Sequence, residues 1–231
     1  MKYAAVVFDL FGTLIDKFSL REGTKMLEQI ASVLSVSSDD FIELYFSTYN
    51  EGALGVFKNT EAKFEYICQK LGVPSKHTQI ELAAQIHLDY TRRSITPRPD
   101  STEVLSYLKS SGHKTGLISD CSDVVVKVWQ NTPFASLIDV AVFSCLVGFT
   151  KPDSRIYHVL TEQLKVEPQS CLYIGDGGSQ ELTGAAQVGM HPVLIRVPDE
   201  DITDMYRLDA ERENWNGTVI SSLKEVLTLI E

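Results

Sequence analysis

The fold is decided by the stretch Val6-Val7-Phe8-Asp9-Leu10-Phe11-Gly12-Thr13-Leu14. In it, an apolar run ends in a single carboxylate, Asp9, which is followed closely by glycine and threonine. We interpret the run as a buried β-strand that carries Asp9 into a loop. Taken alone, Asp9 could equally belong to an ordinary turn, because Asp and Gly are both common turn residues.

Three further apolar runs, at 115–118, 139–143 and 171–175, also lead to polar residues. Strands buried on both faces of a parallel sheet have this continuous apolar character, and their carboxyl ends share one edge where ligands bind. The sequence therefore predicts that the polar residues at these strand ends converge on one site. They are Asp9, Ser119, Lys151 and Asp176.

The segment between the first strand and residue 95 has helical periodicity instead. Ser19 and Glu22 have the spacing of a capping box, and Thr60 is placed to cap a later helix. We expect about four helices here, forming a small bundle over residues 16–95. Residues 96–100, with two prolines, would form an extended return to the core, either as an ordinary loop or as a hinge.

From residue 101 the chain alternates helices with apolar strands, which we place at 115–119, 139–144, 171–175 and 192–196. This alternation predicts an α/β fold with a doubly wound parallel sheet, similar to a Rossmann fold. The expected organisation is a discontinuous core, residues 1–15 and 96–231, with a smaller helical domain at 16–95.

Composition limits the classes of function. The 231 residues are 44% hydrophobic and 23% charged, with a formal net charge of -10. A nucleic-acid-binding protein needs a basic face, which this balance does not favour. Small anionic substrates remain possible, because a metal ion and one lysine can reverse the charge locally.

Four cysteines without CxxC spacing predict reduced thiols rather than a zinc site or disulfides. The apolar opening is too short for a secretory signal, and no apolar run reaches the ~20 residues of a membrane span. We therefore expect a cytoplasmic protein without membrane or nucleic-acid partners. The sequence gives no indication of its oligomeric state.

Four motifs, in this order, resemble those of the haloacid dehalogenase-like (HAD) hydrolase superfamily. They are Asp9-Leu10-Phe11-Gly12-Thr13, Ser119 after a strand, Lys151-Pro152-Asp153, and Gly175-Asp176-Gly177-Gly178-Ser179-Gln180-Glu181. The resemblance covers nearly the whole chain, and it implies that the helical insert is a mobile cap over the active site. Substrate choice would then be set by the cap.

The resemblance implies that Asp9 is a nucleophile that forms a covalent intermediate, which water later hydrolyses. It also implies Mg²⁺, held by the Asp9 side chain, the backbone carbonyl of Phe11 and the Asp176 side chain, since oxygen-only ligands suit this ion. Glu181 would orient a metal-bound water. Lys151 would supply positive charge, and Ser119 a hydrogen bond to the transferring group.

Phe11 departs from the pattern of the family's phosphatases. The resemblance implies that those enzymes have a second aspartate at this position, which protonates the leaving group. General acid–base assistance is typically worth ~10²–10⁴ in rate. The family's haloacid dehalogenases also lack that aspartate, but they use no metal and bind halide with a cap arginine. Residues 41–55 contain no arginine.

The motifs are therefore mixed, and we give more weight to the acidic pair Asp176 and Glu181. The prediction is a Mg²⁺-dependent phosphatase acting on a small phosphorylated metabolite, with a 2-haloacid dehalogenase as the alternative. A receiver domain of bacterial signalling is less compatible, since it is roughly half this length and lacks the insert. A non-catalytic binding protein on the same scaffold stays possible.

Overall fold

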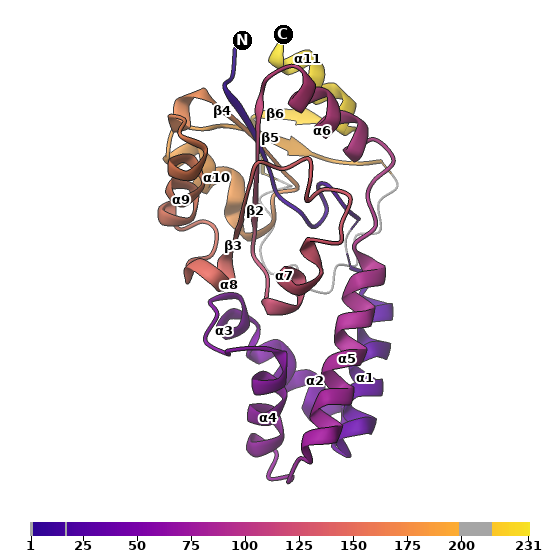
Figure 1. Cartoon of the computed structure of the whole chain (residues 1–231). Helices are drawn as coiled ribbons and strands as arrows, with labels where there is room; N and C mark the ends of the chain where they lie inside the picture. Colours follow the sequence, from indigo (N-terminus) through magenta and orange to yellow (C-terminus); the bar gives the residue numbers. More distant parts are fainter. Residues whose placement is uncertain (1, 17, 199–213) are drawn as a thin grey trace.

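The computed structural model describes residues 2–16, 18–198 and 214–231 and contains a six-stranded parallel sheet (Figure 1). The strand order is β3-β2-β1-β4-β5-β6. This confirms the predicted doubly wound fold. The strands are β1 (Ala5–Phe8), β2 (Lys114–Ser119), β3 (Val140–Phe143), β4 (Cys171–Gly175), β5 (His191–Ile195) and β6 (Thr218–Ile220).

Alternating residues of the strands face two apolar layers, so the sheet is buried on both sides. In β1, Val6 and Phe8 join one core cluster, whereas Ala5 and Val7 join the other. The first cluster includes buried residues of α6 (Ser101–Ser110), α7 (Asp123–Trp129) and α11 (Val226–Ile230). The second includes α9 (Ser154–Leu164) and α10 (Glu181–Gln187), which cover the opposite face in Figure 1. The short elements of the core are α8 (Ser144–Val147), η1 (Pro168–Ser170), η2 (Gly178–Gln180) and η4 (Leu223–Glu225).

Strand β1 lies between β2 and β4, which is where the direction of winding reverses. The chain runs outward through β2 and β3 on one side of β1, and through β4, β5 and β6 on the other. Ligands of open α/β sheets bind beyond the carboxyl ends of the strands at such a switch point. The residues that follow β1, β2 and β4 are therefore brought together by topology.

The helices that follow β1 and precede α6 lie together at the end of the molecule opposite both termini (Figure 1). We call them the helical insert. Its helix α5 packs on α1 and α4 and also contacts α7 of the core. That the insert forms a separate domain bounded at 16 and 95, and that it moves, stays a prediction. Its helices are α1 (Leu20–Leu34), α2 (Ser38–Ser47), α3 (Tyr49–Ala53), α4 (Thr60–Lys70) and α5 (His77–Ser94).

Two predicted helix caps differ from the structure. Ser19 precedes α1 without making a side-chain cap bond, and Glu22 instead pairs with Lys25 at 2.8 Å. Helix α4 is capped by Asn59, whose side chain accepts a hydrogen bond from the Ala62 N–H at 2.9 Å. Thr60, the expected cap, instead donates to Asp123 of the core at 2.8 Å. A threonine that is available for tertiary contact can thus leave the capping role to its neighbour.

All four cysteines are free thiols, in agreement with the sequence prediction. Within the described residues, no helix combines the length and apolar character that a membrane span requires.

Candidate active site

Asp9 follows β1 directly and is buried at the switch point of the sheet. Its backbone N–H extends the strand pairing by donating to the Ile174 carbonyl at 2.9 Å, which fixes where the side chain leaves the sheet. Burial raises the pKa of the Asp9 carboxyl to about 6; Lys151 opposes this rise and Asp176 adds to it. Asp9 is therefore mainly ionised at neutral pH and available as a nucleophile.

Lys151 connects Asp9, which follows β1, with Glu181 at the start of α10. Its ammonium donates to Asp9 Oδ1 and to Glu181 Oε2, each at 2.6 Å, and its side chain is 4% exposed. Burial alone would lower the pKa of Lys151, but the carboxylates of Asp9 and Glu181 raise it well above its usual value. The ammonium thus remains a fixed positive charge beside the candidate nucleophile.

Glu181 is fully buried behind this pair, at the start of α10. Besides Lys151, its carboxylate accepts hydrogen bonds from the Tyr173 hydroxyl and the Gly177 N–H, both at 2.9 Å. Burial and the nearby Asp9 raise the pKa of Glu181, whereas the Lys151 ammonium opposes this rise and favours the ionised carboxylate. Glu181 therefore holds the loop after β4 and the Lys151 ammonium in place.

Asp176 enters the site from that same loop. It follows Gly175 at the end of β4, and its Oδ1 accepts a hydrogen bond from the Gly178 N–H at 3.0 Å. Gly177 has φ of +86°, a conformation that glycine adopts without steric cost. The turn brings Asp176 back toward Asp9.

Oxygen atoms of Asp9, Asp176 and Glu181 lie within 4.8 Å of one another. Three buried carboxylates this close, with one lysine between two of them, leave excess negative charge that favours a cation. The donor set consists of oxygen only, which suits a hard ion such as Mg²⁺. Because both Glu181 oxygens already accept protein hydrogen bonds, the residues fit an ion held mainly by Asp9 and Asp176.

Ser119 ends β2 as predicted and is fully buried. Its hydroxyl has no hydrogen-bond partner among the described residues. The cavity at the site is lined by the next residue, Asp120, whose Oδ1 accepts a hydrogen bond from the Lys151 N–H at 3.1 Å. Burial raises the pKa of Asp120. That Ser119 binds the transferring group stays a prediction.

The loop that follows Asp9 is stabilised by hydrogen bonds from Arg98, a residue to which the sequence assigned no structural role. Arg98 is buried and donates to the Gly12 carbonyl at 2.8 Å, while its N–H donates to the Leu14 carbonyl at 3.0 Å. Arg98 thus holds the nucleophile loop, and its position between Pro97 and Pro99 is the only signal of this role in the sequence.

Phe11 lines the cavity on the side of the helical insert and packs edge-on against Phe18, with ring centroids 4.9 Å apart. No proton can be transferred by this ring. The position where a general acid would be expected is therefore part of an apolar wall.

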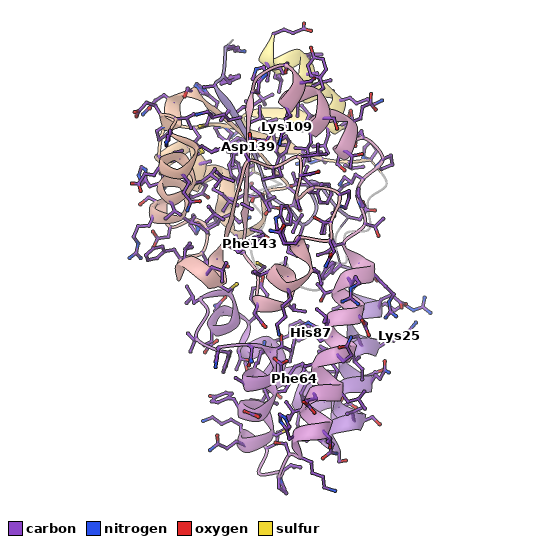
Figure 2. All side chains as sticks on the ribbon, viewed as in Figure 1. Lys25, Phe64, His87, Lys109, Asp139 and Phe143 are labelled. Carbon is purple, nitrogen blue, oxygen red and sulfur yellow. The ribbon has the colours of Figure 1, made fainter. Side chains whose placement is uncertain are left out.

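The helical insert completes the cavity, which has a volume of about 90 Å³. Its contribution includes Tyr45 from α2, Lys63 from α4 and His87 from α5. Figure 2 shows His87 where the insert meets the core, with Phe64 farther from the core within the insert. The sequence does not mark these residues as part of a site, because helical periodicity alone places Lys63 and His87 no differently from surface positions.

A family model for haloacid dehalogenase-like hydrolases matches residues 3–189. The chain belongs to this hydrolase family. The assignment confirms the resemblance drawn from the four motifs and excludes a receiver domain.

Individual relatives include both kinds of enzyme considered above. A glyceraldehyde 3-phosphate phosphatase of Methanothermobacter thermautotrophicus is 25% identical over 232 residues, covering 96% of this chain and 99% of that protein. The (S)-2-haloacid dehalogenase H-109 of Pseudomonas putida is 27% identical over 188 residues, covering 80% and 81%. A solved HAD phosphatase from Thermococcus onnurineus has a TM-score of 0.66 at 21% identity, covering 98% and 97%, which shows a shared fold.

Proposed function

We propose that this hydrolase is a Mg²⁺-dependent phosphatase that cleaves a small phosphate monoester through an aspartyl intermediate on Asp9. The observation that carries the proposal is the convergence of Asp9, Lys151, Asp176 and Glu181 at the switch point of the sheet. The match to a phosphatase over nearly the full length of both chains supports it. We also infer that the helical insert, residues 16–95, is a cap domain and that the protein is cytoplasmic.

In the first step, an Asp9 oxygen attacks phosphorus while the bond from phosphorus to the leaving oxygen breaks. Lys151 offsets the repulsion between the carboxylate and the incoming phosphoryl group, because its ammonium lies 2.6 Å from Asp9 Oδ1. In the second step, water attacks phosphorus, inorganic phosphate leaves and the Asp9 carboxylate is regenerated.

Asp9, the backbone carbonyl of Phe11 and Asp176 are the proposed metal ligands. When bound there, a divalent cation would neutralise phosphoryl oxygens and bring the two negatively charged partners together. Glu181 would not bind the ion directly but would orient Lys151 and the loop that carries Asp176, through hydrogen bonds that it accepts from both.

Phe11 shapes the choice of leaving group. Since it cannot donate a proton, we expect esters of acidic alcohols, whose oxygen leaves as an anion, to react faster than simple alkyl phosphates.

Release of 4-nitrophenol from its phosphate ester tests this function, because the leaving group needs no proton. Turnover should require added Mg²⁺ and should be lost in Asp9→Asn. Asp89→Asn is the matched control, since this carboxylate pairs with Arg92 on the surface of α5, does not line the cavity and should leave turnover unchanged. Turnover that persists in Asp9→Asn would refute the proposed nucleophile.

A second candidate is hydrolysis of 2-haloacids, favoured by Phe11 and by the dehalogenase relative. Halide release from 2-chloropropionate without added metal, together with inactivity on 4-nitrophenyl phosphate, would establish this alternative. Inactivity on both substrates would indicate a protein that binds without catalysis.

A further inference from the structure

The part of the cavity wall that the helical insert supplies contains a buried cation, Lys63 of α4. Lys63 is 8% exposed and lines the cavity together with Asp9 and Lys151. Its ammonium donates to the Tyr45 carbonyl at 3.0 Å and lies 3.9 Å from the centroid of the Tyr45 ring. An ammonium has three N–H donors, so these contacts leave hydrogen-bonding capacity.

No carboxylate among the described residues lies within ion-pair distance of Lys63. Glu51 and Asp123 act on it only at longer range, while burial lowers the pKa of Lys63 to about 8. A buried lysine without a paired anion is costly, since charged groups in protein interiors are normally paired. The position therefore favours an anion supplied by a ligand.

A second buried group lies on the same wall. His87 is buried and its Nε2 lies 3.1 Å from the Tyr45 hydroxyl. Burial, reinforced by Lys63, lowers the pKa of His87 to about 4, so the ring is neutral at pH 7. The neutral ring therefore fixes the Tyr45 side chain without adding a second charge beside Lys63.

The size of the cavity favours a small substrate. Its volume of about 90 Å³ corresponds to roughly six to nine water-sized groups. A phosphoryl group at Asp9 and a second anionic group of the same small ester at Lys63 would share this one cavity.

We propose that Lys63 forms a subsite for a carboxylate on the substrate, which makes the substrate class the phosphate monoesters of short hydroxy acids. This inference rests on the proposed phosphatase function and extends it to the leaving-group end. Lys63 supplies the charge, and Tyr45 positions it: the Tyr45 carbonyl accepts a hydrogen bond from the Lys63 ammonium, and the Tyr45 hydroxyl is held by His87. The subsite distinguishes a carboxylate from an uncharged group of equal size.

Two esters of matched length test the subsite: 2-phosphoglycolate, and 2-hydroxyethyl phosphate, in which a hydroxymethyl group replaces the carboxylate. The wild type should show a KM at least about tenfold lower for 2-phosphoglycolate. In Lys63→Met this preference should fall to less than about twofold, because one charge-assisted hydrogen bond accounts for a difference of this order.

Lys70→Met is the control. Lys70 belongs to the same helix and also lies over an aromatic ring, 5.3 Å from the Tyr66 centroid, but it is exposed and far along α4 from the cavity lining. It should retain the wild-type preference. Lys63→Gln, which keeps an N–H donor without the charge, serves as a second variant, and urea unfolding establishes that each variant is folded.

A binding measurement separates this inference from the phosphatase proposal. In Asp9→Asn protein with Mg²⁺, calorimetry should show 2-phosphoglycolate binding at least about tenfold more tightly than 2-hydroxyethyl phosphate, and adding Lys63→Met should remove the difference. This result would support the subsite even if the wild type cleaved no phosphate ester. Equal affinity for the two esters, or an unchanged preference in both Lys63 variants, would overturn it.

Discussion

Gly175 is the residue at which a single methyl group should disturb the whole site. It ends β4 immediately before Asp176, and its backbone does not require positive φ. An alanine Cβ placed there would lie only 2.5 Å from Cδ of Glu181. Since ordinary contact between such atoms is about 3.5 Å, the carboxylate would have to move by about 1 Å.

Glu181 cannot move by that distance and keep its partners. Its oxygens are held by Lys151 at 2.6 Å and by Tyr173 and the Gly177 N–H at 2.9 Å. Hydrogen bonds to charged groups contribute about 1.5–3 kcal/mol each, so losing two of the three would cost about 3–6 kcal/mol. Displacing Lys151 and the Asp176 loop by about 1 Å should reduce turnover about 10²-fold.

Gly175→Ala is therefore compared with Gly116→Ala, a buried glycine in β2. The new methyl group at Gly116 would meet only the ends of Leu160 and Leu164, at 3.0 and 3.1 Å, and these side chains can shift. Urea unfolding and 4-nitrophenyl phosphate turnover are measured for both variants. If the free energy of unfolding of Gly175→Ala were within about 1 kcal/mol of that of Gly116→Ala, and the two variants were equally active, the anchoring role of Glu181 would be refuted.

Three further predictions concern the metal, the leaving group and pH. EDTA should abolish aryl phosphatase activity and Mg²⁺ should restore it, while Asp176→Asn should raise the half-maximal Mg²⁺ concentration at least about tenfold; an unchanged requirement would remove Asp176 from the metal site. Phe11→Asp should raise alkyl phosphate turnover relative to aryl phosphate turnover by at least about tenfold, because it introduces a general acid; an unchanged ratio would contradict this role for position 11. For His87, the folded pKa of about 4 lies below the ordinary 6.5, so the unfolded chain binds the extra proton and stability is lost as pH falls below about 6.5. In urea unfolding, the free energy of unfolding of the wild type should therefore fall by about 2 kcal/mol more than that of His87→Gln between pH 7 and pH 5. Parallel pH profiles of the two proteins would contradict a buried neutral His87.

The sequence by itself determined the fold class, the strand ends and the hydrolase family. Strands buried on both faces must be apolar along their whole length, so a polar residue at the end of each run marks the ligand-binding edge. Asp9, Lys151 and Asp176 were identified in this way. Strand β6 was not predicted, because Thr218 and Val219 are exposed and the strand has no continuous apolar run.

Only the tertiary structure decided which polar residues share a contact. Lys63 and His87 are 24 positions apart on separate helices and meet through Tyr45 of a third helix, and Arg98 reaches back to Gly12 across 86 positions. Helical periodicity shows that a residue belongs to a face but not what covers that face. Burial, which distinguishes Lys63 from Lys70 on the same helix, arises only from tertiary packing, in which α4 contacts α2 and Lys63 lies over Tyr45.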